Sequence, residues 1–134
     1  MKYVLGLLSI VLLLNACNNP KNYTPAKDAI VASSEFVQAC LKGDFEKASF
    51  YMIQDEQNKT LLKEREEKYR STTASQQRQL GEASMQNITI EEISPTETIV
   101  YYKNSYDNIG RKVKAILNNN TWLVDFKYSF NPNL

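Results

Sequence analysis

The side chains of this chain that could carry out acid–base chemistry are carboxylates and tyrosines, because the sequence contains no histidine. Histidine is the side chain that ordinarily exchanges protons near neutral pH, and it is a common metal ligand. A tyrosine hydroxyl, with an unperturbed pKa of about 10, is a poor base by itself. An enzyme built from this sequence would therefore pair a tyrosine with a carboxylate. The sequence has no cysteine cluster for zinc and no glycine-rich phosphate loop, so we expect no metal and no cofactor.

Asp125 is the carboxylate most worth testing for such a role, because it is the one acid inside the last predicted strand. Side chains alternate between the two faces of a strand. If Trp122, Val124 and Phe126 point into a pocket, Asp125 points away from it. We therefore expect Asp125 to face solvent, and we expect the glutamate clusters elsewhere in the chain to form solvated surface. No residue is predicted to be catalytic.

Cys17 has the most specific chemical context in the chain. Lys2 precedes an apolar run from Val4 to Leu14, and the run ends on Leu14-Asn15-Ala16-Cys17. This ending resembles the lipobox of bacterial lipoprotein signal peptides, in which the cysteine thiol receives a diacylglyceryl group and the cysteine becomes the new N-terminus. The run is shorter than the roughly 20 apolar residues of a transmembrane helix. The resemblance implies that residues 1–16 are a signal peptide and that Cys17 is lipidated.

A lipidated Cys17 would hold the protein on a membrane permanently, since it carries two or three acyl chains where a single chain binds only marginally. Residues 17–23 then form a polar tether between the lipid and the domain. The residues directly after the cysteine, Asn18-Asn19-Pro20-Lys21, include no acid. This composition resembles that of lipoproteins that are not retained at the inner membrane. We expect a cell-envelope location, at the outer membrane and facing the periplasm if the cell has two membranes.

The length and charge of the chain indicate one domain without a nucleic-acid partner. Residues 24–130 are long enough for one domain with its own core, and residues 131–134 form a short tail. The chain has 16 basic and 15 acidic side chains, and nucleic-acid affinity would rest on a basic excess. Cys40 is the only cysteine besides Cys17 and lies in an apolar helical pattern, so we expect it to be a small core residue.

The first half of the domain has helical patterns. Apolar residues at three- and four-residue spacings predict a helix that starts at Thr24-Pro25 and stops at Gly43. Asp44 predicts the cap of a second, short helix. Residues 55–70 are rich in Glu–Lys and Glu–Arg pairs four apart, which predicts a helix with one side in water. Residues 71–79 are polar and fit either a loop or a frayed continuation of that helix.

The second half of the domain changes to an alternation of period two, which is typical of strands. Four segments have this pattern: Ile88 and Ile90 with their polar neighbours, residues 98–102, residues 113–117 and residues 122–130. Turn residues separate them at Ser94-Pro95-Thr96, at residues 106–110 and at Asn118-Asn119-Asn120. Helices followed by strands joined by hairpins predict an α+β fold with an antiparallel meander.

Two motifs add a family resemblance to this order of elements. They are the Gly-Asp-Phe-Glu-Lys-Ala segment at residues 43–48 and the Trp-x-Val-Asp-Phe segment at residues 122–126. Together with the element order they resemble the nuclear transport factor 2-like superfamily, a cystatin-like α+β cone, and more narrowly bacterial lipoproteins with a domain of unknown function. The resemblance implies N-terminal helices packed on a curved four-stranded antiparallel sheet, with a pocket between the long helix and the concave face. The superfamily includes enzymes, transport adaptors and immunity proteins, so this fold does not give a function.

We expect a non-catalytic domain that binds a small apolar ligand or a protein partner. The residues expected to line the cone are Tyr102, Trp122, Phe126 and Tyr128, which share strand parity with neighbours placed inward. Trp122 is also expected to be largely buried against the face of the first helix that carries Ile30 and Val37. Two alternatives stay open: a small isomerase- or dehydratase-like enzyme using tyrosine and a carboxylate, and an immunity or assembly partner protein.

Overall fold

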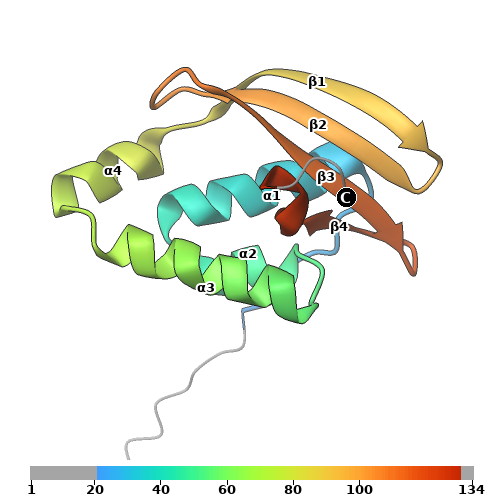
Figure 1. Ribbon diagram of the computed structural model, residues 1–134, viewed down its shortest axis with the longest axis horizontal. Coiled ribbons are helices and arrows are strands. Elements are labelled where there is room, and N and C mark those ends of the chain that lie inside the picture. The colour runs from blue at the N-terminus through green and yellow to red at the C-terminus, as the bar shows by residue number, and fades with distance from the viewer. Residues whose placement is uncertain (1–20, 131–134) are drawn as a thin grey trace, which may run out of the picture.

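The structure, a computed structural model, describes residues 21–130, so Cys17, the segment before it and the tail at residues 131–134 lie outside the described residues. The helices precede the strands and lie against one face of the sheet (Figure 1). The elements are α1 (Ala29–Lys42), α2 (Phe45–Phe50), α3 (Glu56–Arg70), α4 (Ala74–Glu82), β1 (Met85–Ser94), β2 (Glu97–Asn104), β3 (Gly110–Asn118), β4 (Thr121–Asp125) and the 3₁₀ turn η1 (Phe126–Ser129). The predicted α+β class is confirmed.

Helix α1 begins four residues later than predicted. Its N-cap is Asp28, whose Oδ1 accepts a hydrogen bond from the backbone N of Val31 at 2.8 Å, and Thr24-Pro25 stays in the extended segment before it. The prediction at the other end is confirmed, because Gly43 closes the helix with a φ of 74°. Asp44 then caps α2 by accepting a hydrogen bond from the backbone N of Lys47.

The two remaining helices, α3 and α4, lie in the polar middle of the chain. Helix α3 matches the predicted charged helix and starts at the N-cap Asp55. Residues 71–79, left open between loop and helix, contain the start of α4, which begins at a capping box formed by Thr73 and Gln76 and continues to Glu82. The reciprocal hydrogen bonds of this capping box therefore begin a new helix in a segment whose polar sequence has no clear helical periodicity.

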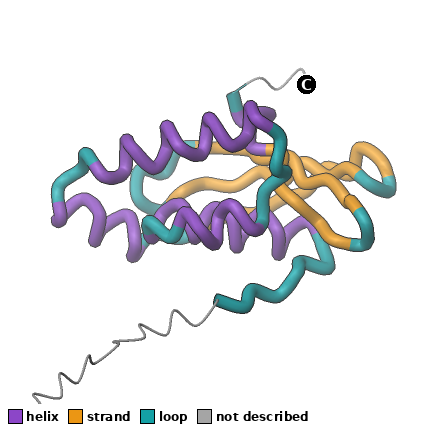
Figure 2. Tube along the Cα trace, turned by 90° about the horizontal axis from the view of Figure 1, so that it is seen from below, coloured by secondary structure: helices purple, strands orange, loops and turns teal. Residues whose placement is uncertain are grey.

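The four strands form one antiparallel sheet in the order β1-β2-β3-β4, as the meander prediction requires. Asn119 and Asn120 make the last hairpin turn with positive φ angles, a conformation that asparagine tolerates better than most residues. Figure 2 shows the strands gathered toward one end of the domain and the helices toward the other. Strand β1 lies at the outer edge, and none of its residues is fully buried, so Ile88 and Ile90 are exposed strand residues.

The core lies between α1 and the inner face of β2, β3 and β4. Ala32 and Phe36 of α1 are almost completely buried, as are Val100, Ala115 and Val124 of the three strands. The cross-strand pairs Val100–Val113 and Ala115–Val124 place these residues on one face of the sheet. Burial of this shared face is what holds the helix on the sheet.

Trp122 does not take the buried central position that was predicted for it. It is half-buried at the margin of the core, and Ile30, its expected neighbour, is 40% exposed. The backbone N of Trp122 donates to the carbonyl of Ala26 at 3.0 Å, so this residue lies beside the segment before α1. Val124, two residues later, takes the buried position with 0% exposure. The prediction was wrong because Trp122 pairs with the extended segment before α1 and Ile30 faces away from the core.

The last strand is also shorter than predicted, because β4 ends at Asp125 and the chain turns into η1. The 3₁₀ turn breaks the alternation that had placed Tyr128 inward with Phe126. Phe126 does face α1, with its ring 5.0 Å from that of Phe36. The centroid of the Tyr128 ring instead lies 4.7 Å from the Nζ of Lys114. Lys114 stands between the inward-facing Val113 and Ala115 in β3, so its side chain is on the outer face of the sheet. Tyr128 is therefore buried on the outer face of the sheet.

Candidate functional site

A pocket of about 430 Å³ lies between α1 and the inner face of the sheet, where the predicted fold requires one. This volume falls in the range of about 300–1,000 Å³ that small-molecule sites occupy. Its walls come from α1, α3, β2, β3 and η1, five elements that are distant in the sequence. The lining residues are Phe36, Val37, Cys40, Leu41, Arg65, Tyr102, Asn104, Gly110, Arg111, Lys112, Val113, Phe126, Ser129 and Phe130.

The apolar part of the lining is aromatic along one side. The Phe126 ring meets that of Phe36 edge-on at 5.0 Å and that of Phe130 at 5.1 Å. Phe130 is 63% exposed, so one wall of the pocket reaches the surface. Cys40 lies among these apolar groups as the predicted core residue, and burial raises the pKa of its thiol to about 12. A thiol with that pKa stays protonated at neutral pH and is a poor nucleophile.

Tyr102 supplies a hydroxyl to the pocket, as its predicted strand parity requires. The residue is buried, and burial raises the pKa of its hydroxyl to about 12. The group is therefore a neutral donor and acceptor at physiological pH. Its neighbour Tyr101 points to the other side of the strand, where its hydroxyl donates to Oε2 of Glu91 at 2.6 Å. The two successive tyrosines thus divide between the pocket and the surface.

Three basic residues line the pocket, and they differ in whether a carboxylate neutralises them. Arg111 donates to both carboxylate oxygens of Asp107, from Nη1 at 2.8 Å and from Nη2 at 2.6 Å. This hydrogen-bonded ion pair lowers the pKa of Asp107 to about 2, so the pair is fully ionised at neutral pH. Arg65 and Lys112 have no ion-pair partner among residues 21–130.

Two of the four ligand-binding residues predicted from the sequence line this pocket. Tyr102 and Phe126 do so, while Trp122 and Tyr128 are not among the lining residues. Arg65 was not anticipated, because it stands in a helix full of charges. A signal for it does exist in the sequence: the residues three and four positions away are Leu61, Leu62, Lys68 and Tyr69, and none of them is acidic. Arg65 thus shares the apolar stripe of α3 and lacks the intrahelical partner that Arg70 finds in Glu66.

The prediction that Asp125 faces solvent is wrong. Asp125 is 5% exposed, and its Oδ1 accepts hydrogen bonds from Nδ2 of Asn58 at 3.0 Å and from Nζ of Lys127 at 2.6 Å. Asn58 of α3 is itself completely buried and accepts a hydrogen bond from the backbone N of Lys127 at 2.8 Å. Asp125 alternates with the buried Val124 as predicted, but it is the last residue of β4, and the start of α3 packs against that end of the sheet. Asp125 therefore joins α3 to the end of the sheet and does not line the pocket.

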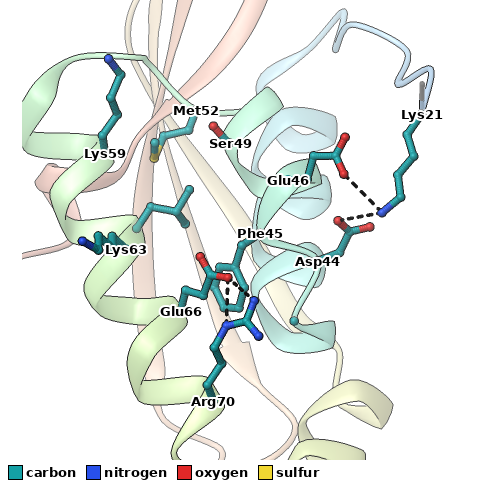
Figure 3. A pocket seen from close by; sticks show the side chains of 12 residues that line it. Lys21, Asp44, Phe45, Glu46, Ser49, Met52, Lys59, Lys63, Glu66 and Arg70 are labelled. Carbon is teal, nitrogen blue, oxygen red and sulfur yellow. Dashed lines mark hydrogen bonds and ion pairs between the residues drawn. The ribbon is translucent and has the colours of Figure 1, made fainter. Parts of the chain in front are cut away.

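A second hollow, of about 510 Å³, lies between α2 and α3 and is mostly polar (Figure 3). Its charged side chains largely neutralise one another. Nζ of Lys21 lies 3.6 Å from Asp44 and 3.5 Å from Glu46, and Arg70 pairs with Glu66 at 2.5 Å. The groove therefore offers less uncompensated charge to a ligand than the pocket beside α1 does.

No protein-family model matches the chain, and no curated protein is significantly similar to it. Within residues 21–130, no group of three or more cysteine or carboxylate side chains is placed to hold a metal ion. Within the same range, no helix combines the length and the apolar composition that a membrane span requires.

Proposed function

We propose that this protein is a lipid-anchored envelope lipoprotein whose domain, of the nuclear transport factor 2-like kind, binds a small ligand without transforming it. The observation that carries the binding role is the pocket between α1 and the sheet. It combines an aromatic wall with the hydroxyl of Tyr102 and a few basic groups, a composition typical of small-molecule sites. The enzyme alternative needs a carboxylate beside that hydroxyl, and no Asp or Glu lines the pocket in the described part of the chain.

The anchor is proposed from the sequence, from the Leu14-Asn15-Ala16-Cys17 segment. Replacing Cys17 with serine removes the thiol that would receive the diacylglyceryl group. We expect the Cys17→Ser chain, expressed in a bacterium that processes lipoproteins, to lose lipidation and to leave the membrane fraction or remain an uncleaved precursor. Intact-mass measurement of the mature proteins checks this. A mature wild-type chain that starts at any residue other than Cys17, or that starts there unmodified, would contradict the proposal.

The binding role can be tested by closing the pocket at its mouth. Ser129 lines the pocket but is exposed, and its side chain makes one exposed hydrogen bond, from Oγ to the carbonyl of Lys112 at 3.1 Å. A large side chain there can block the opening while leaving the buried core residues in place. We expect the full chain in phospholipid nanodiscs to bind the neutral probe 4-phenylbutan-1-ol in saturation-transfer NMR, with empty nanodiscs as background. Ser129→Trp should abolish the signal above that background.

Ser75 provides the matched control, because it is an exposed serine of α4 that does not line the pocket. Ser75→Trp adds the same surface area and should leave binding unchanged. Failure of the wild-type chain to bind this probe or either of its two charged analogues, the acid and the amine of the same skeleton, would refute the ligand-binding role. Equal binding by the Ser129→Trp and Ser75→Trp chains would place the probe elsewhere on the protein.

A further inference from the structure

We propose that the pocket beside α1 selects a small organic acid, a ligand with an apolar body that ends in one carboxylate, and that Arg65 is the residue that binds the carboxylate. This inference rests on the proposed binding function and specifies the chemistry of the ligand. It is drawn from the charges that line the pocket, from the position of Arg65 on α3 and from the distribution of apolar groups around it.

The pocket has an uncompensated positive charge. Its lining includes Arg65, Arg111 and Lys112 but no acidic residue. Asp107 neutralises Arg111 through two hydrogen bonds. Like Arg65, Lys112 has no carboxylate partner among the residues that the structure describes, but its Nζ lies beside the ring of Tyr128 on the outer face of the sheet. The uncompensated charge inside the pocket is therefore that of Arg65. An anionic group would complete the charge balance of this site, and a cation would be repelled.

Arg65 is the better placed of the two remaining cations. It is half-buried and stands on the same side of α3 as Leu62, which packs in the core. Its charge acts on two groups inside the pocket: it opposes the rise that burial causes in the pKa of Cys40, and it adds to the larger effect of Arg111 in opposing the same rise at Tyr102. Lys112 lies near the ring of Tyr128, with its Nζ 5.5 Å from the ring centroid on the outer side. A guanidinium can also form two parallel hydrogen bonds with a carboxylate, which an ammonium cannot.

The apolar residues that line the pocket indicate that the rest of the ligand is apolar. Phe36, Phe126 and Phe130 form a continuous aromatic wall, and Val37 and Val113 add aliphatic surface. A small inorganic anion would leave this wall without contacts. An apolar body fills it, and the hydroxyl of Tyr102 offers one further hydrogen bond. The site is therefore suited to an amphipathic acid and poorly suited to acetate or free phosphate.

Three probes of nearly equal size separate charge from apolar contact: 4-phenylbutyrate, 4-phenylbutan-1-ol and 4-phenylbutylamine. We expect the full chain in nanodiscs to bind the acid at least about tenfold more tightly than the alcohol, since a charge-assisted pair is worth that much in a partly buried site. The amine should bind more weakly than the alcohol. Acetate at the same concentration should not displace the acid. Dissociation constants come from saturation-transfer titrations corrected for empty nanodiscs.

Substitutions in α3 test whether Arg65 causes the preference for the acid over the alcohol. Arg65→Gln should bring the acid and the alcohol to about equal affinity while leaving the affinity for the alcohol unchanged, which also shows that the variant is folded. Arg65→Lys should retain part of the preference. Arg70→Gln removes an exposed arginine of the same helix that is paired with Glu66 and lies outside this pocket, and it should change neither affinity.

The outcomes separate this inference from the proposed function. Equal binding of acid and alcohol by the wild-type chain would overturn the acid selectivity and leave the binding role standing. A preference for the acid that survives in Arg65→Gln would overturn the role of Arg65. Failure of all three probes to bind would refute the proposed function and this inference together.

Discussion

Replacing Asn58 with alanine is expected to lower the free energy of unfolding by about 2–5 kcal/mol. The Asn58 side chain is completely buried and joins three partners, Asp55, Asp125 and the backbone N of Lys127. Alanine leaves the Lys127 N–H and one Asp125 oxygen with fewer partners in a site that α3 shields from water. Each buried group left unsatisfied costs about 1–3 kcal/mol. Urea denaturation of wild type and variant measures the difference.

Gln57 is the matched control for this experiment. It precedes Asn58 in the first turns of α3 and is exposed, so Gln57→Ala should change the free energy of unfolding by no more than about 0.5 kcal/mol. A loss for Asn58→Ala as small as that of the control would mean that α3 is not attached to the sheet through Asn58 and Asp125. In that case the hydrogen bond between Asn58 and Asp125 would not stabilise the fold.

The second large effect is expected at Gly43, where Gly43→Ala should cost about 2–4 kcal/mol in the free energy of unfolding. One part comes from the backbone, because the φ of 74° at this position disfavours any side chain. The other part comes from Tyr69 of α3, whose Cε1 would lie 2.5 Å from the new Cβ. The Tyr69 ring packs edge-on against Phe45 at 5.7 Å, so it cannot move aside without losing that contact.

A double-mutant cycle separates the two parts. In the Tyr69→Ala background the steric part disappears, and Gly43→Ala should then cost about 1–2 kcal/mol, the backbone part alone. Strict additivity of the two substitutions would show that the ring does not obstruct the new methyl group. Gly81 serves as the control, since a Cβ there meets nothing within 4 Å and its position in α4 favours alanine. Gly81→Ala should be neutral or stabilising by up to about 1 kcal/mol.

Local chemistry made much of the fold predictable. Gly43 and Asp44 mark a helix end and the next helix start because left-handed backbone and side-chain capping act within a few residues. In β2, Tyr102 points inward and Tyr101 outward because successive side chains of a strand point to opposite faces, which is also a local property of the chain. The failures fall where a longer-range contact decided the outcome, as at Trp122, whose backbone bonds to Ala26.

The sequence by itself therefore determined the class of the fold, the order of its elements and the lipobox-like segment on which the anchor proposal rests. Only the tertiary structure decided which charges share a site. Arg111 pairs with the carboxylate of Asp107, four residues away, whereas Arg65 lines the same pocket as Tyr102 and Phe126, and that pocket is built from five elements distant in the sequence. Asp125 alternates with the core residues of β4 as predicted, and yet Asn58 of α3 and Lys127 cover its carboxylate at the end of that strand. Electrostatic and packing interactions act across space, so a residue's environment depends on the elements folded against it.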